Sequence, residues 1–196
     1  LILTLVFLLS SQARLSYGTA LNDIPIMNDA WWNALTAIKQ DSKPDAIINS
    51  WWDFGHWFKY WAQRRVTLDG ATQNHPNAHW LGELMITPNE DESVAILRML
   101  DCGNNQAIEE INKRLQDTEF SHDLLHRLML ADANKYHLDI SKAEALLKDR
   151  GFTDEEIARI LKLAVCDPPE DFFITSEDMV GKAGVWGHFG LWNFSK

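Results

Sequence analysis

Two tryptophans and one aspartate stand next to each other at Trp51, Trp52 and Asp53, and Phe54 and Gly55 follow them. Each indole N–H can donate a hydrogen bond, and the carboxylate can accept one. Such a trio can surround one small hydroxyl, whose proton goes to the carboxylate while its oxygen accepts from the indoles. A site of this kind rejects a ligand without the hydroxyl, because its own buried polar groups are then unpaired.

A Trp–Trp pair that follows a strand is more often part of a core, so the pair alone decides little. The complete segment Trp51-Trp-Asp-Phe-Gly55, however, resembles the WWDYG motif of oligosaccharyltransferase catalytic subunits, with Phe54 in place of the tyrosine. In that family the motif recognises the Ser or Thr two residues after the acceptor Asn. The resemblance therefore implies that Trp51, Trp52 and Asp53 contact this hydroxyl, and that any contact of the missing phenol is lost.

The flanking segments extend the resemblance over most of the chain. The segment Asn28–Leu35 is similar to the amphipathic stretch before the motif in archaeal members, and residues 64–74 are similar to the stretch after it. Residues 178–189 lie where the family carries a second motif, of helical Met-x-x-Ile or Asp-x-x-Lys form. The resemblance thus implies that Met179 and Lys182 belong to the acceptor site.

The spacing of Met179, Lys182, Trp186 and Phe189 predicts a single helical face. Lys182 stands where the family's isoleucine would touch the threonine methyl. Glycines within this segment weaken a helix, so part of it can be irregular.

The resemblance implies a fragment of a glycosyltransferase that transfers a lipid-linked oligosaccharide to Asn of Asn-X-Ser/Thr sequons. The implied partners are the acceptor polypeptide, the lipid-linked donor and the membrane. Family members use a divalent cation, Mn²⁺ or Mg²⁺, held by external loops of a transmembrane domain. We therefore expect no catalytic residue and no metal ligand here. We expect the full-length protein to be a multi-pass membrane protein, with this domain on the extracytoplasmic side. The alternative is a secreted, non-catalytic peptide-binding module with the same clamp.

Composition supports a folded domain that does not bind nucleic acid. The chain has 196 residues, 46% hydrophobic and 23% charged, which suffices for one domain with a core. Its net charge of −10 repels nucleic acid, and we find no basic stripe. Nine tryptophans suit a surface that binds peptide or sugar. Cys102 and Cys166 could form a disulfide or remain two buried thiols, since sequence spacing alone does not show proximity.

Two histidine pairs, His75 with His79 and His122 with His126, are spaced i, i+4 and could each ligate zinc from one helical face. The zincin pattern requires a Glu directly after the first His, and neither pair has it. No third ligand is identifiable, so solvated or core histidines are the preferred interpretation.

Three carboxylates, Asp53, Asp69 and Glu83, could supply the acid and base of a hydrolase. Nothing in their spacing forces them together. This hypothesis of a metal-dependent or acid–base hydrolase is therefore weak.

The elements that must position the motif indicate an α/β fold: a mostly helical soluble domain around a few buried strands, preceded by the tail of a transmembrane helix. The apolar run 1–9 is too short to span a bilayer and lacks the basic flank of a signal peptide. We expect residues 1–21 to be the end of a transmembrane helix, irregular after Arg14. Residues 22–196 would form the extracytoplasmic sequon-recognition domain, truncated at its C-terminus.

Periodicity and caps predict the elements of that domain. Asn28 and the box Thr153–Glu156 are expected to cap helices. Strands are expected at 46–50, 66–68 and 172–175, and helices at 30–38, 56–65, 77–86, 90–100 and over most of 106–166, with breaks near Thr118, Asp139 and Gly151. The motif then lies just past a strand end, where such folds commonly place their sites.

Overall fold

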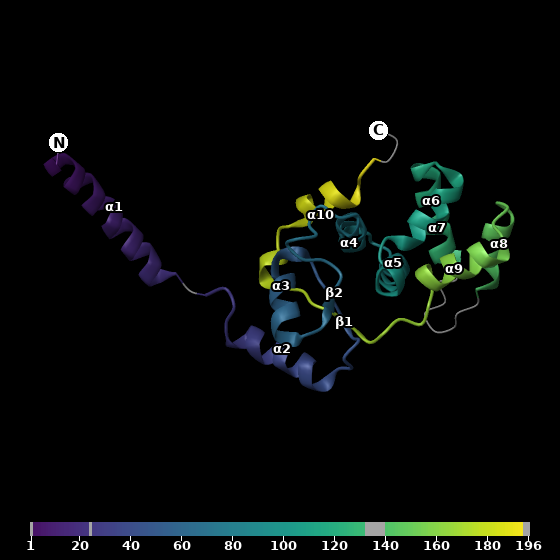
Figure 1. The fold of residues 1–196 in the computed structure, drawn as a ribbon, viewed down its shortest axis with the longest axis horizontal. Coiled ribbons are helices and arrows are strands. Elements are labelled where there is room, and N and C mark those ends of the chain that lie inside the picture. Colours follow the sequence, from purple (N-terminus) through teal and green to yellow (C-terminus); the bar gives the residue numbers. More distant parts are fainter. Residues whose placement is uncertain (1, 24, 132–139, 194–196) are drawn as a thin grey trace.

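The computed structural model describes residues 2–23, 25–131 and 140–193. Its first element, α1 (Ile2–Asn22), projects away from the folded body (Figure 1). The irregular stretch predicted after Arg14 begins only after Asn22, because this helix continues for another two turns. In these turns the side chains of Thr19 and Asn22 donate hydrogen bonds to backbone carbonyls one turn back, so both residues are compatible with a helix. Within the described ranges, no helix has both the length and the apolar content needed to cross a bilayer. The assignment of residues 1–21 to a membrane helix stays a prediction.

Three short parallel strands lie at the centre of the body, in the order β2-β1-β3. They are β1 (Ile47–Asn49), β2 (Arg65–Val66) and β3 (Asp171–Phe173). All three residues of β1 are buried, as expected for a middle strand covered on both faces. Parallel neighbours need crossover connections, and helices supply both of them. The predicted α/β fold, mostly helical around a few buried strands, is confirmed.

The helices follow the predicted order. They are α2 (Asp29–Asp41), the 3₁₀ turn η1 (Trp52–Phe54), α3 (Gly55–Trp57), the π-helical turn η2 (Phe58–Ala62), α4 (Asn77–Ile86), α5 (Glu90–Gly103), α6 (Gln106–Leu115), α7 (Thr118–Ala131), α8 (Ser141–Lys148), α9 (Asp154–Ala164), the 3₁₀ turn η3 (Glu177–Met179) and α10 (Ala183–Gly190). The two predicted caps are confirmed. Helix α5 runs three residues past its predicted end, and the break expected near Asp139 lies outside the described residues.

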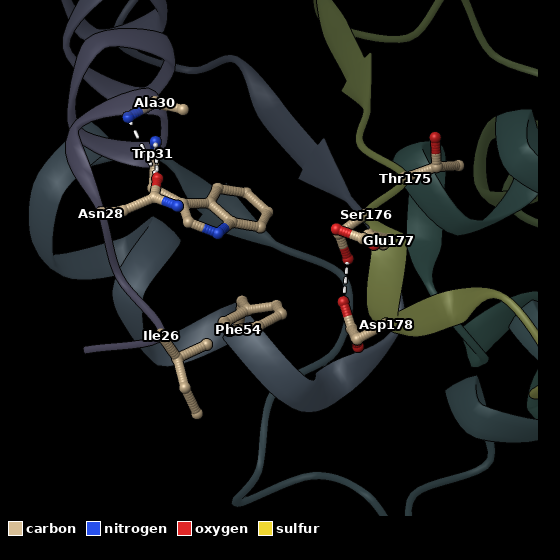
Figure 2. Close-up of a pocket in the computed structure, with 9 residues that line it drawn as sticks. All are labelled: Ile26, Asn28, Ala30, Trp31, Phe54, Thr175, Ser176, Glu177 and Asp178. Atoms are coloured by element: carbon tan, nitrogen blue, oxygen red, sulfur yellow. Dashed lines mark hydrogen bonds between the residues drawn. The ribbon is translucent and has the colours of Figure 1, made fainter. Parts of the chain in front are cut away.

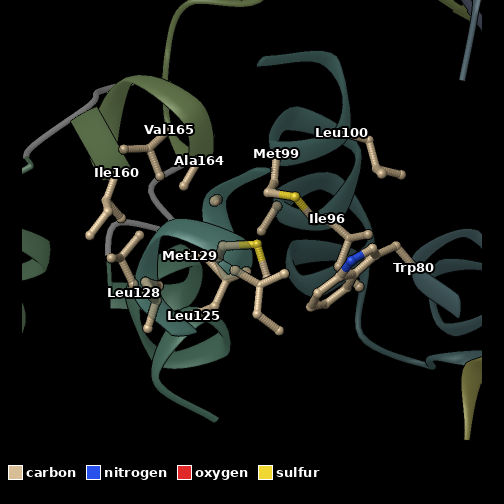
Figure 3. Close-up of a cluster of buried hydrophobic side chains, with 14 of the residues drawn as sticks. Trp80, Ile96, Met99, Leu100, Leu125, Leu128, Met129, Ile160, Ala164 and Val165 are labelled. Atoms are coloured by element: carbon tan, nitrogen blue, oxygen red, sulfur yellow. The ribbon is translucent and has the colours of Figure 1, made fainter. Parts of the chain in front are cut away.

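Two clusters of buried side chains hold these elements together. The larger cluster fills the space between α4, α5, α7 and α9 and contains Trp80, Met99 and Leu125 (Figure 3). The smaller one joins α2, β1 and η2 through Leu35, Ile48 and neighbours. Burial of such side chains is the main source of stability for the fold.

A disulfide joins Cys102 on α5 to Cys166 just after α9, with the two Cα atoms 5.8 Å apart. Of the two alternatives left open by the sequence, the structure thus contains the disulfide. It closes a loop between cysteines 64 positions apart, and this loop includes α6 to α9. The bond fixes the start of the segment that returns to the sheet as β3.

Candidate functional site

A buried polar network supports the chain where β1 ends and the motif begins. The fully buried Asn49 donates from Nδ2 to Oδ1 of Asp101 at 2.9 Å, and its Oδ1 accepts from the Thr67 hydroxyl. The next residue, Ser50, donates its hydroxyl to the carbonyl of Ile174 at 2.8 Å. Burial raises the pKa of Asp101 to about 7. These bonds satisfy the buried polar groups and fix the backbone from which the motif leaves the sheet.

The last motif residue, Gly55, packs backbone against backbone. A Cβ there would lie 2.4 Å from the carbonyl oxygen of Leu68 and 2.6 Å from Cβ of Asp69. Asp69 is itself held by Lys59, with Nζ to Oδ2 at 2.6 Å. Burial raises the pKa of Asp69, but the bonds from Lys59 and Thr72 outweigh it, and the pKa is lowered overall. Only glycine leaves room for this close approach.

The two motif indoles differ in exposure. Trp51 is 1% exposed and meets the rings of Trp186 and Phe189 edge-on, at centroid distances of 6.5 and 5.6 Å. Trp52 is partly buried against the same cluster. The Nε1 atoms of Trp52 and Trp186 are both buried and make no hydrogen bond. Because a buried N–H without an acceptor is costly, each is a donor that a bound ligand could satisfy.

The carboxylate of the motif forms an ion pair across the site. Lys182 Nζ lies 2.9 Å from Asp53 Oδ2 and 2.7 Å from Asp178 Oδ2. Burial lowers the pKa of Lys182, but the bonds to the two carboxylates outweigh it and raise the pKa overall. Asp53 and Lys182, which are 129 positions apart in the sequence, are therefore neighbours in space.

A cavity of about 540 Å³ opens beside this ion pair, between α2, η1 and the segment that follows β3 (Figure 2). Figure 2 shows the rings of Trp31 and Phe54 on one side and the polar residues Ser176 to Asp178 on the other. The ring centroids of Trp31 and Phe54 are 4.9 Å apart. The cavity is lined by Ile26, Asn28, Ala30, Trp31, Phe54, Thr175, Ser176, Glu177 and Asp178. One wall of the cavity is thus aromatic, and the other is polar and acidic.

Residues 44–156 match the family model described as the STT3/PglB/AglB core domain. The chain belongs to the STT3/PglB/AglB family. It is 34% identical over 173 residues to the dolichyl-phosphooligosaccharide-protein glycotransferase of Methanocaldococcus jannaschii, covering 87% of this chain and 18% of that protein. It is 32% identical over 180 residues to the protein of the same name from Methanococcus voltae, covering 88% and 19%. The chain thus spans less than a fifth of these relatives.

The crystal structure of the C. jejuni PglB C-terminal domain is similar with a TM-score of 0.45 and 16% identity, over 81% of this chain and 52% of that one. The family membership predicted from the segment Trp51–Gly55 is confirmed by the family model and the archaeal relatives.

In this STT3/PglB/AglB chain, the predicted single helical face from Met179 to Phe189 is wrong. Met179 ends η3, and Gly181 follows with φ +89° in the left-handed region. This conformation interrupts a right-handed helix, so α10 begins only at Ala183. Met179 is buried and packs in the larger cluster, whereas Lys182 reaches the motif carboxylate from the turn.

Sequence reasoning did not assign Trp31 or Asp178 to the site. The available signal for Trp31 was the amphipathic face of its helix beside the motif. The signal for Asp178 was its spacing of four residues from Lys182, which permits an ion pair within one turn.

The histidine pairs considered as alternative metal sites have different neighbours in the structure than the sequence predicted. His122 and His126 share a face of α7, as predicted, but His75 precedes α4 and contacts Asn77, with Nδ1 to Oδ1 at 3.2 Å. The predicted face of His75 with His79 is therefore wrong. His79 instead meets His122, with the Nε2 atoms 2.9 Å apart.

The three carboxylates considered for hydrolysis have separate partners. Asp53 pairs with Lys182 and Asp69 with Lys59, while Glu83 faces histidines. No acid–base pair of a hydrolase is formed by these three residues.

Proposed function

We propose that this chain is part of an oligosaccharyltransferase and that it recognises the Ser or Thr at the +2 position of the acceptor sequon. The observation that carries this proposal is the Asp53 carboxylate, which shares Lys182 with the cavity-lining Asp178 and whose neighbour in sequence, Trp52, has a buried indole N–H without a hydrogen bond. The names of the archaeal relatives support the enzyme class.

The chemistry of the clamp follows from these groups. The Lys182 ammonium holds Asp53 from the Oδ2 side at 2.9 Å, which leaves Oδ1 to accept a hydroxyl proton. The indole N–H of Trp52 can donate to the oxygen of the same hydroxyl. A threonine or serine satisfies both groups, and a side chain without a hydroxyl satisfies neither.

The divalent cation of the family, Mn²⁺ or Mg²⁺, does not fit the residues around the motif. The carboxylates of Asp53 and Asp178 share the Lys182 ammonium, which holds the position that a cation would take between them. We propose that the cation ligands and the catalytic residues lie outside this chain. The chain by itself should then bind acceptor peptide and transfer no glycan.

We also propose that this chain lies on the extracytoplasmic side of a multi-pass membrane protein, and that this protein uses a lipid-linked oligosaccharide as donor. The disulfide between Cys102 and Cys166 supports this location, because such bonds persist mainly in oxidising compartments. The names of the archaeal relatives, which include dolichyl-phosphooligosaccharide, support the donor class.

To test this, the isotope-labelled chain is titrated with acceptor peptides and binding is monitored by NMR, which detects weak binding. Three peptides differ only at the +2 position, which is Thr, Ser or Val. Valine has the shape of threonine and lacks the hydroxyl. We expect binding of the Thr and Ser peptides, with shifts at the indole N–H of Trp52, and at least tenfold weaker binding of the Val peptide. Equal affinity for Thr and Val would contradict the proposal.

A further inference from the structure

Five imidazole and carboxylate side chains from three helices converge at a place where the proposed peptide site has no role for them. Helix α4 contributes His79 and Glu83, helix α7 contributes His122 and His126, and Glu92 comes from α5. The residues on α4 and on α7 are each spaced i, i+4, so each helix turns one face toward the other. We call these five residues the His–Glu cluster. None of the five lies in the motif or lines the cavity beside it.

Three ligand-type atoms of the cluster form a small triangle. His79 Nε2 lies 2.9 Å from His122 Nε2 and 3.6 Å from Glu83 Oε2, and the latter two atoms are 3.9 Å apart. The point equidistant from all three lies about 2.0 Å from each, which is the bond length of zinc to imidazole nitrogen and carboxylate oxygen. From this geometry we propose that His79, Glu83 and His122 bind a transition-metal dication of the zinc class.

The protonation of His79 suits this role. Its Nδ1 lies 3.0 Å from the carbonyl oxygen of Phe189, which can only accept, so Nδ1 carries the proton. The neutral ring then presents the Nε2 lone pair to the centre of the triangle. Metal-binding histidines are held in this same way, by a carbonyl or carboxylate on the other ring nitrogen.

Neutral histidine is the form that binds metals. The Glu83 carboxylate supplies the negative charge that a dication needs.

Unpaired atoms give a second, independent indication of a ligand. Glu83 Oε2, the third corner of the triangle, is buried and makes no hydrogen bond. His126 Nε2 faces Glu83 Oε1 at 3.2 Å and can supply a fourth ligand or fix the carboxylate. Buried polar atoms without a partner are rare in folded proteins, and an absent ion is one of their ordinary explanations.

Aromatic rings hold the two histidines of the triangle in place. The ring of Trp80 stacks on the ring of His122, with the centroids 4.9 Å apart, and the ring of Trp192 stacks on the ring of His79, with the centroids 5.8 Å apart. The side chains of His79, His122 and Glu83 are only 3%, 18% and 17% exposed. A preorganised site with little water contact binds a metal without a large ordering cost.

The donor set selects the metal. Two imidazole nitrogens and one carboxylate suit zinc and its transition-metal neighbours, whereas Mg²⁺ and Ca²⁺ prefer oxygen ligands. A metal here would cross-link α4 to α7 and, through the bond from His79 to Phe189, would also fix α10. The inference does not depend on the proposed peptide recognition.

The test uses the 196-residue chain without a histidine tag, titrated with ZnCl₂ and separately with CoCl₂. Retained zinc is measured by elemental analysis after dialysis, and Co²⁺ reports its geometry through its visible absorption. The variants are His122→Ala and the near-isosteric Glu83→Gln. The exposed His188→Ala is the matched control, since it removes one histidine outside the cluster.

We expect one zinc per wild-type chain, tetrahedral Co²⁺ bands, and at least tenfold weaker metal binding in both cluster variants. The control should bind like wild type. Should His122→Ala fail to fold by circular dichroism, Glu83→Gln alone decides. The proposal is overturned when wild type retains no zinc, or when Glu83→Gln retains it with unchanged Co²⁺ bands.

Discussion

The substitution Asp53→Ala isolates the acceptor half of the proposed hydroxyl clamp. It leaves the Lys182 ammonium paired with Asp178 at 2.7 Å, so no buried charge is orphaned. The variant should therefore fold like wild type. What it removes is the carboxylate oxygen that would accept the hydroxyl proton of the +2 Ser or Thr.

The magnitude follows from the exposure of the carboxylate. A hydrogen bond to a charged group contributes about 1.5–3 kcal/mol when it is buried. The Asp53 side chain is 28% exposed, so water competes with the ligand and the lower end applies. We expect a loss of about 1.5 kcal/mol, or roughly tenfold in Kd, for a Thr peptide.

The assay is a cycle of two proteins and two peptides. Wild type and Asp53→Ala are each titrated with the Thr and the Val peptide, and the difference of differences is the coupling between carboxylate and hydroxyl. The exposed Asp149→Ala, at the end of α8, controls for net charge. A coupling near zero, with both peptides weakened equally by Asp53→Ala, would refute the clamp.

Three further substitutions test the support of the site. Gly55→Ala should destabilise the chain by about 1–3 kcal/mol in urea unfolding, because its Cβ meets a backbone carbonyl at 2.4 Å; Gly184→Ala, with nothing within 4 Å, should not, and equal effects would contradict this. Loss of the disulfide through Cys102→Ser with Cys166→Ser should cost about 4 kcal/mol for the closed loop, and an unchanged unfolding midpoint would count against it. The pKa of Asp101, raised by burial to about 7, means that its contribution to stability is present below about pH 4 and lost as pH rises through 7. The unfolding free energies of wild type and Asp101→Asn should be measured from pH 4 to 8. Over this range the wild type should lose up to about 4 kcal/mol more than the variant, and parallel pH dependences of the two proteins would refute this.

Local signals predicted the elements well, because their causes lie within a few residues. Asn28 caps α2 by accepting from two backbone N–H groups, and Thr153 with Glu156 forms a capping box at α9. The β-branched run around Ile48 becomes the buried middle strand. These interactions depend on spacing alone, which the sequence displays directly.

The site was only partly predictable, because its decisive contacts join distant residues. The ion pair of Asp53 with Lys182 depends on how β3 and η3 return to the sheet, which no local pattern displays. The meeting of His79 with His122 depends on how α4 and α7 each pack against α5. The disulfide was undecided for the same reason, since two cysteines 64 positions apart show no proximity in sequence.

The position of the +2 side chain in the bound peptide is the most direct test of the central claim. A sequon peptide with a ¹³C-labelled threonine methyl, bound to the chain, would be measured by nuclear Overhauser contacts. The account predicts contacts from this methyl group to the Trp52 indole. Contacts to a different surface at saturation, with none to Trp52, would contradict it.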